Sequence, residues 1–174
     1  MPLTSELQVR FSGKQTGSND FGGPSFSPLM EFTAQLGSGT VASQADLLFV
    51  DERTLAPSAN DDLDLAGVLQ AALGGVLTMV EIVGLLIINQ PKTKGVAASL
   101  GTLTVGGGTN PFLGFLTGTT PAIRAIGPNG MLALFNPDGS GLGAVTPATA
   151  DILRIANSAA GISTYQIAIL GRSA

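Results

Sequence analysis

Residues 150–171 read ADILRIANSAAGISTYQIAILG, and this stretch decides the fold class. It holds two runs rich in β-branched residues, separated by the small residues Ser158-Ala159-Ala160-Gly161. This pattern predicts two strands joined as a β-hairpin. In the second run, residues 163–170, the side chains of both faces are mainly apolar. A strand of this kind is predicted to lie inside a sheet.

The rest of the chain repeats short strand-like runs between turns. Its 24 Gly and 10 Pro break the sequence into pieces that are mostly too short for helices. Residues 80–89 (VEIVGLLIIN) are almost continuously apolar and precede Pro91, which predicts a central strand covered on both faces. Further strands are predicted at residues 7–11, 29–36, 45–50, 99–105, 111–116, 122–126 and 131–135.

One segment, residues 64–73 (DLAGVLQAAL), has the features of a helix. Its apolar residues recur at spacings of three and four, Asp64 is a suitable cap, and Gly74 is a suitable end. An extended segment followed by a turn is the alternative, and the sequence leaves both open. We therefore predict an all-β, jelly-roll-like β-sandwich with an extended N-terminal arm and at most one short helix.

The arm is predicted from residues 12–28 (SGKQTGSNDFGGPSFSP), which are rich in Gly and Ser and poor in aliphatic residues. Such a segment cannot build a core of its own. It is either a mobile surface loop or an arm that orders on a neighbouring subunit, with Phe21 and Phe26 as interface anchors. The predicted organisation is an N-terminal strand and arm over residues 1–45, followed by a β-sandwich domain over residues 46–174.

The composition limits the chemistry of the chain. It has no Cys and no His, which excludes disulfides, thiolate nucleophiles, Cys/His zinc sites and imidazole acid–base catalysis. Hydrophobic residues make up 44% and charged residues only 11%, against roughly 25% charged residues in an average soluble domain. A surface with so few charges is predicted to be polar and uncharged in part, and in part covered by other subunits.

Carboxylates are the remaining candidates for a catalytic or metal site, at Asp51-Glu52 and in the run Asp61-Asp62-Leu63-Asp64. Neither has the order of ligands that a calcium loop requires. We interpret them as solvated turn acids, with Asp64 as a helix cap. The cluster Gly106-Gly107-Gly108 lacks the Lys-Ser/Thr of a phosphate-binding loop. No enzyme activity, cofactor or metal is predicted.

Membranes and nucleic acids are not predicted partners. Residues 65–88 are long and apolar enough to suggest a span, but they contain Glu81 and the pair Gly74-Gly75, which favours a buried core segment. The net charge is −4, without a basic stripe, and there is one Tyr and no Trp. The N-terminal MPLTSELQVRF lacks the layout of a signal peptide, so an intracellular site of synthesis is expected.

Several motifs resemble those of small structural proteins found in the virions of tailed bacteriophages. The most specific is residues 150–171, similar to an Ala-Asp-x-Leu-x-Ile/Val-Ala-Asn-Ser-x-Ala-Gly segment followed by a Tyr-x-Ile-x-Ile-x-Gly strand. The other similar segments are residues 51–56 (DERTLA), 63–67 (LDLAG), 80–88, 106–110 and 128–135. Residues 1–45 lie outside the similarity.

The resemblance implies a virion component without catalytic residues. We predict a capsid decoration or cement protein, a homotrimer on the outer surface of the phage head that bridges major capsid protein subunits. The alternatives are a tail or fibre-base (spike-base) component and a host-adhesion binding module. The predicted interface residues are Phe21, Phe26 and Arg154. The Arg154 side chain lies mid-strand, where it either pairs with neighbours in its own chain or faces a partner subunit.

Overall fold

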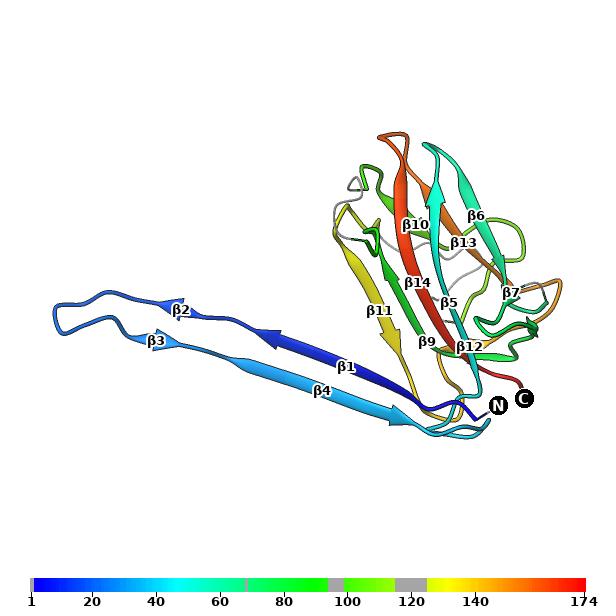
Figure 1. Cartoon of the computed structure of the whole chain (residues 1–174), viewed down its shortest axis with the longest axis horizontal. Coiled ribbons are helices and arrows are strands. Elements are labelled where there is room, and N and C mark those ends of the chain that lie inside the picture. Colours follow the sequence, from blue (N-terminus) through cyan, green and yellow to red (C-terminus); the bar gives the residue numbers. More distant parts are fainter. Residues whose placement is uncertain (1, 68, 94–98, 115–124) are drawn as a thin grey trace.

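The computed structural model describes residues 2–67, 69–93, 99–114 and 125–174 (Figure 1). In these residues the regular secondary structure consists of strands without a helix, so the predicted all-β class is confirmed. The strands are β1 (Ser5–Ser12), β2 (Gln15–Thr16), β3 (Ser25–Phe26), β4 (Leu29–Leu36), β5 (Leu47–Leu55), β6 (Asn60–Asp64), β7 (Leu69–Gln70), β8 (Val76–Leu77), β9 (Glu81–Ile88), β10 (Leu103–Val105), β11 (Met131–Phe135), β12 (Gly143–Ala144), β13 (Ile152–Asn157) and β14 (Ser163–Arg172).

Strands β5 to β14 form a body in which two sheets stack face to face (Figure 1). The larger sheet has the order β11-β9-β14-β5, with β12 also paired to β9, and the smaller has the order β10-β13-β6. Alternate residues of both sheets point inward and form one apolar core. This arrangement is compatible with the predicted β-sandwich, whereas the jelly-roll order of strands stays a prediction. The core includes Phe49, Leu63, Leu85, Leu103, Leu153, Ile155, Tyr165, Ile167 and Ile169.

The predicted central strand is confirmed. Strand β9 lies between β11 and β14, and β14 lies between β9 and β5, so both have a paired strand on each side. β14 is also the interior strand that the apolar pattern of residues 163–170 predicts. Prediction and structure agree closely at Leu29–Leu36 (β4) and Met131–Phe135 (β11).

The predicted hairpin of residues 150–171 is wrong. Strands β13 and β14 form as expected, but β13 pairs with β6 and β10 in the smaller sheet while β14 belongs to the larger one. The connection crosses from one sheet to the other, and the side-chain amide of Asn157 supports it by donating to the carbonyls of Leu55, Ala56 and Gly161. β13 finds its hydrogen-bonding partners in β6 and β10, and β14 in β5 and β9, so that each side of the core receives one apolar strand.

Of the two alternatives for residues 64–73, the described residues adopt the extended segment with a turn and not the helix, since a turn leads into strand β7. Asp64 caps that turn by accepting a hydrogen bond from the Ala66 amide. The backbone of Leu65 is bonded outside the segment, to Asp151 and Met79. These long-range bonds take the groups that a helix would have used.

Two other predicted strands, residues 111–116 and 122–126, lie partly outside the described residues. In residues 111–114 only Pro111 makes a single bridge, to Ile152, and residues 115 and 116 lie outside the described residues. Of residues 122–126, the first three lie outside the described residues, and Ile126 makes an isolated bridge to Leu103. Pro111 has no amide hydrogen, which is consistent with its lack of a regular ladder. The described part of residues 65–88 contains β7, β8 and the whole of β9, and no described helix is long and apolar enough to cross a membrane.

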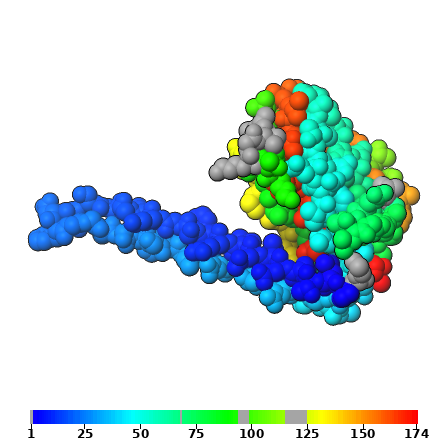
Figure 2. Space-filling view, viewed as in Figure 1, coloured from blue at the N-terminus to red at the C-terminus, as the bar shows by residue number. Residues whose placement is uncertain are grey.

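Residues 5–36 form a long two-stranded β-hairpin, which we call the arm. β1 pairs with β4 over eight residue pairs, and β2 with β3 continues the ribbon toward a turn at Asn19–Gly22. Figures 1 and 2 show the arm as a narrow projection that leaves the body near both chain termini. The predicted domain boundary between residues 45 and 46 falls between β4 and β5.

Candidate interaction surface

The arm has one apolar face and one mainly polar face. Because paired residues of an antiparallel ribbon lie on the same face, the pairs Leu7–Ala34, Val9–Phe32 and Phe11–Met30 form what we call the apolar face. The opposite face carries the pairs Glu6–Gln35, Gln8–Thr33 and Arg10–Glu31. Two of these polar pairs are bonded, Gln35 to Glu6 at 2.9 Å and Arg10 to Glu31 at 3.3 Å.

Much of the apolar face is exposed. The side chains of Val9, Phe11, Met30 and Phe32 are all in the exposed class, and Phe11 retains 58% of its accessible surface. A two-stranded hairpin is marginally stable in water unless its apolar face packs against something. The outer part of the arm therefore has the composition of a ribbon that is covered in use.

The base of the arm is packed against the body. Leu36 and Ala45 form a small buried cluster with Val83, against which Phe135 and Leu170 also pack. Phe32 meets Phe135 edge to face, with ring centroids 6.4 Å apart. The arm is thus seated on the larger sheet rather than joined to it only by its connecting loop.

A buried arginine holds the same joint. Arg172, with a side chain 1% exposed, forms an ion pair with Glu81 and donates to the carbonyls of Gln44 at 2.9 Å and Pro137 at 3.2 Å. These partners come from the loop after the arm, the start of β9 and the loop after β11. Because a buried guanidinium needs all of its partners, this contact fixes where the arm leaves the body.

The larger sheet has an outer face that points away from the core, on the same side as the arm base. Its cross-strand registers place these residues in rows. The first row, nearest the arm, is Leu48, Leu170, Gly84 and Phe135; the second is Val50, Ala168, Leu86 and Ala133; the third is Glu52, Gln166, Ile88 and Met131. The first two rows are entirely apolar, and Val50 at 52% and Met131 at 60% are well exposed.

A groove lies where the arm meets this outer face. Residues 4–7 form one wall, and Leu48, Leu86, Ala133 and Phe135 are among the residues of the other. The groove encloses about 310 Å³. Gly84 lies in the first row between Phe135 and Leu170, where a side chain would meet both neighbours. The space between the arm and the body is therefore an apolar recess.

The predicted anchors Phe21 and Phe26 lie at the far end of the arm. Phe21 belongs to the terminal turn, where its amide donates to the side chain of Asn19, and its ring is fully exposed. Phe26 lies in β3 and is also exposed. Their role as interface anchors stays a prediction, consistent with two aromatic rings held far from the core.

Arg154 lies elsewhere, on the smaller sheet. Its guanidinium forms two hydrogen bonds of 2.6 Å to Asp62 of the paired strand β6. This pairing raises the pKa of Arg154 and lowers that of Asp62. The guanidinium of Arg154 also packs closely against the backbone of Gly108, where an added side chain would clash with it. The structure thus gives Arg154 a partner in its own chain and does not bring it near Phe21 or Phe26.

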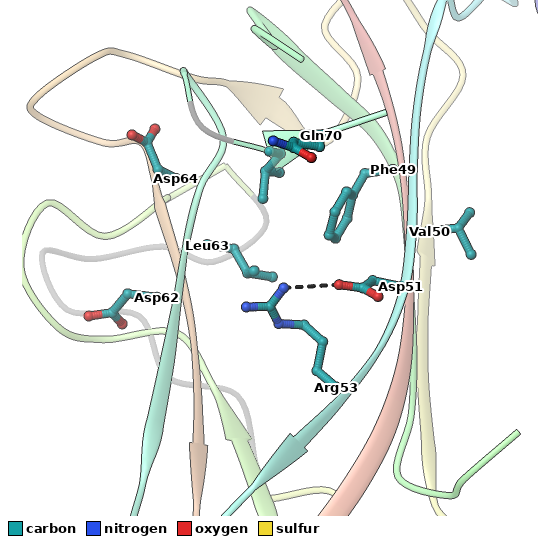
Figure 3. A pocket seen from close by; sticks show the side chains of 9 residues that line it. Phe49, Val50, Asp51, Arg53, Asp62, Leu63, Asp64 and Gln70 are labelled. Atoms are coloured by element: carbon teal, nitrogen blue, oxygen red, sulfur yellow. Dashed lines mark hydrogen bonds and ion pairs between the residues drawn. The ribbon is translucent and has the colours of Figure 1, made fainter. Parts of the chain in front are cut away.

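The acidic residues line the open edge between the two sheets rather than a turn. A cleft of about 410 Å³ between β5 and β6 is lined by Phe49, Leu63 and Arg53, among others (Figure 3). Figure 3 shows Asp62 and Asp64 on the far side of β6 from Arg53, which pairs with Asp51 at 3.0 Å. The interpretation as turn residues is therefore wrong for Asp51, Asp61 and Asp62, which lie in strands, while Asp64 caps a turn and not a helix.

Asp61 is the best-connected of these acids. It accepts hydrogen bonds from Arg53 and from the Tyr165 hydroxyl, the latter at 2.5 Å. The bond to Asp61 raises the pKa of Arg53, whereas burial, followed by the bond to Asp61, raises the pKa of Tyr165. Through these bonds Asp61 of β6 links the smaller sheet to β5 and β14 of the larger sheet. Because its oxygens are bonded to a guanidinium and a phenol, it does not resemble a free general base.

No protein-family model, curated protein or solved structure matches the chain. Among the described residues, no group of three or more acidic, Cys or His side chains could hold a metal ion. The feature that the structure offers for function is therefore the combination of the apolar face of the arm and the outer face of the larger sheet. Sequence reasoning missed both, although the alternation in LQVRF (7–11) and the apolar second face of residues 163–170 contain the signal.

Proposed function

We propose that this chain is a structural subunit of a virus particle, a capsid decoration or cement protein on the outer surface of a tailed-phage head. Its partners would be the major capsid protein and further copies of the chain, assembled as a homotrimer. A jelly-roll order of strands, the absence of enzymatic activity, and synthesis in the host cytoplasm belong to the same proposal.

The observation that carries this proposal is the arm. A ribbon with one apolar face, fixed at its base by Arg172 and exposed along Phe11 and Met30, is suited to lie on another protein. The motif resemblance of residues 150–171 to virion structural proteins points to the same class of protein. The low content of charged residues agrees with a chain that is partly covered in use.

The mechanism would be burial of apolar surface at many identical contacts. Each Å² of apolar surface removed from water contributes roughly 25 cal/mol, from which the cost of association is subtracted. The free energy of binding through a single arm is therefore small. Contacts repeated over a closed shell act together, because the release of one subunit does not release its neighbours.

The experiment is to count and locate the chain in purified particles of the virus that encodes it. Quantitative mass spectrometry should give a copy number close to that of the major capsid protein. A particle reconstruction should place the chain on the outside of the head. A few copies at the tail would support a tail or fibre-base component instead, and absence from the particles would overturn the proposal.

A binding assay addresses the host-adhesion alternative. An adhesion module should bind host cells or their surface glycans as an isolated protein. The exposed aromatic residues Phe11, Phe21 and Phe26 lie on the narrow arm, whereas carbohydrate sites usually present aromatic rings beside polar groups in a pocket. We therefore expect the purified chain to show no saturable binding to host cells.

A further inference from the structure

The two apolar surfaces of the chain match in size. The three apolar pairs of the arm span residues 7–11 and 30–34, which extend for roughly 17 Å at about 3.4 Å per residue. The first two rows cross the four strands β5, β14, β9 and β11, which together cover roughly 19 Å at about 4.8 Å per strand. The apolar part of the arm can therefore lie along these rows.

The two surfaces also match in polarity. The charged residues of β1 and β4, namely Glu6, Arg10 and Glu31, all lie on the polar face of the arm. The first two rows of the outer face contain no charged side chain. Placing the apolar face on these rows therefore buries no charge, which would otherwise cost several kcal/mol per group.

The arm of the same chain covers only the near end of this outer face. Its contacts are at the base, where Phe32 meets Phe135 of the first row and Leu36 meets Val83. Beyond that point the arm projects away from the body (Figure 2), and Val50 of the second row stays exposed. The recess between residues 4–7 and the sheet is open to another molecule.

We propose that the apolar face of the arm of one copy lies on the first two rows of the outer face of a second copy, so that copies of this chain associate by exchanging arms. A second copy is the occupant that the structure favours, because each chain has one surface of each kind and both need a cover. The inference rests on the proposed function in so far as it takes the arm to be an assembly element.

The contact area of a single arm is small. An apolar face of roughly 17 Å by 10 Å covers about 170 Å² of the sheet and loses a similar area itself. Two reciprocal contacts then bury about 700 Å² in total, which is in the range of weak associations, below about 1,200 Å². One contact alone buries half of that area, so exchange in both directions, or around a closed ring, is required.

The first test is self-association of the purified full chain, followed by sedimentation velocity over a range of concentrations. Phe11→Glu places a charge on the apolar face of the arm, and Val50→Glu places one on the second row. Each should weaken association about tenfold or more. The matched controls Gln8→Glu, on the polar face of the arm, and Thr54→Glu, beyond the third row of the sheet, add the same charge and should change it less than about threefold.

The second test identifies the contact. Phe11 is replaced by the photo-crosslinker p-benzoyl-phenylalanine, and this chain is mixed with isotope-labelled wild type before irradiation. Crosslinks from position 11 to labelled peptides of β5, β9, β11 or β14 are expected. A monomer at all concentrations, crosslinks confined to one isotope, or crosslinks to another surface would each overturn the inference.

These outcomes are distinct from those that test the proposed function. If the chain is abundant in particles but is monomeric when purified, and position 11 crosslinks there to a different virion protein, the exchange of arms is wrong and the structural role stands. If copies exchange arms but the chain is absent from particles, the structural role is wrong and the exchange of arms stands.

Discussion

The body and the arm use phenylalanine in opposite ways. Phe49 of β5 is 4% exposed and packs in the core between the two sheets, whereas Phe11 of β1 lies on the apolar face of the arm and is largely exposed. The two strands are of similar length, nine residues in β5 and eight in β1. The difference lies in the partner: a strand of the body has a second sheet opposite its apolar face, and the outer arm has none within its own chain.

The comparison shows that a strand pattern with an apolar face does not determine what covers that face. In the body this pattern contributes stability, because burying a large apolar side chain is worth about 1.5–3 kcal/mol. In the arm the same pattern contributes little to the stability of the isolated chain. The free energy of burying these apolar side chains is gained only when the arm binds another molecule. Matched substitutions in the two regions can separate these roles.

The largest effect is expected from Phe49→Ala compared with Phe11→Ala. The first removes a core side chain and leaves a cavity, so it should lower the free energy of unfolding by about 3–5 kcal/mol. The second removes an exposed ring and should change it by less than about 0.5 kcal/mol. Urea denaturation of the monomeric chain measures both. Equal losses would mean that the arm and the body unfold as one packed unit.

The next effect compares two arginines. Arg172→Met leaves Glu81 and the carbonyls of Gln44 and Pro137 without their donor, which should cost about 3 kcal/mol. Arg10→Met breaks only the exposed pair with Glu31 and should cost less than about 0.5 kcal/mol.

The readout for the arginine pair should include the arm itself. Hydrogen exchange at β1 and β4 should become faster in Arg172→Met, because the joint that fixes the arm is lost. Unchanged exchange in the arm, together with a destabilised body, would assign Arg172 to the body alone.

A smaller effect concerns pH and Tyr165. Burial, together with the bond to Asp61, raises the pKa of Tyr165 above its ordinary value of about 10. The folded state therefore keeps a proton that the unfolded state loses, so this stabilisation is complete below pH 10 and is lost as the pH rises through the folded pKa. Tyr165→Phe should cost about 1 kcal/mol at neutral pH.

The pH profile of that variant is the decisive measurement. Between about pH 9 and 11.5, urea midpoints should fall less steeply for Tyr165→Phe than for the wild type, because one proton-linked group is gone. Parallel profiles would show that the hydroxyl of Tyr165 titrates alike in both states. The arm contains no Tyr, so this pH dependence belongs to the body.

The smallest effect is expected from Arg154→Gln. The pair with Asp62 is partly exposed, and solvent screens it, so its loss should cost less than about 1 kcal/mol. Arg154 lowers the pKa of Asp62, so the difference from wild type should be complete above about pH 4 and vanish as the pH falls through the folded pKa. If self-association also weakens tenfold, Arg154 is an interface residue as the sequence predicts.

The sequence predicts the individual strands better than their partners. Met131–Phe135 and Leu29–Leu36 are recognisable because alternation and flanking turn residues are local properties. The separation of β13 and β14 into two sheets is not local, since it depends on β6 and β10 being available to pair with β13. A small-residue turn such as residues 158–161 fits either a hairpin or a crossing between sheets.

The candidate interaction surface could be predicted only in part. Phe21 and Phe26 stand out in sequence because they interrupt a Gly/Ser-rich segment. The apolar face of the arm requires the pairing of residues 7–11 with residues 30–34, which no single segment specifies. Spacings of three and four in residues 64–73 predict a helix, yet the distant partners of Leu65 determine the observed turn.

The seat of the arm also has a consequence for the kinetics of folding. The arm is synthesised before the body, whereas Phe135, Leu170 and Arg172, which seat it, follow about 100 residues or more later in the sequence. Contacts so distant along the chain form slowly, because a long loop must close before they contribute. During synthesis the apolar face of the arm is therefore without its anchor, and the nascent chain is at its most prone to aggregation until β14 has emerged and paired with β5 and β9.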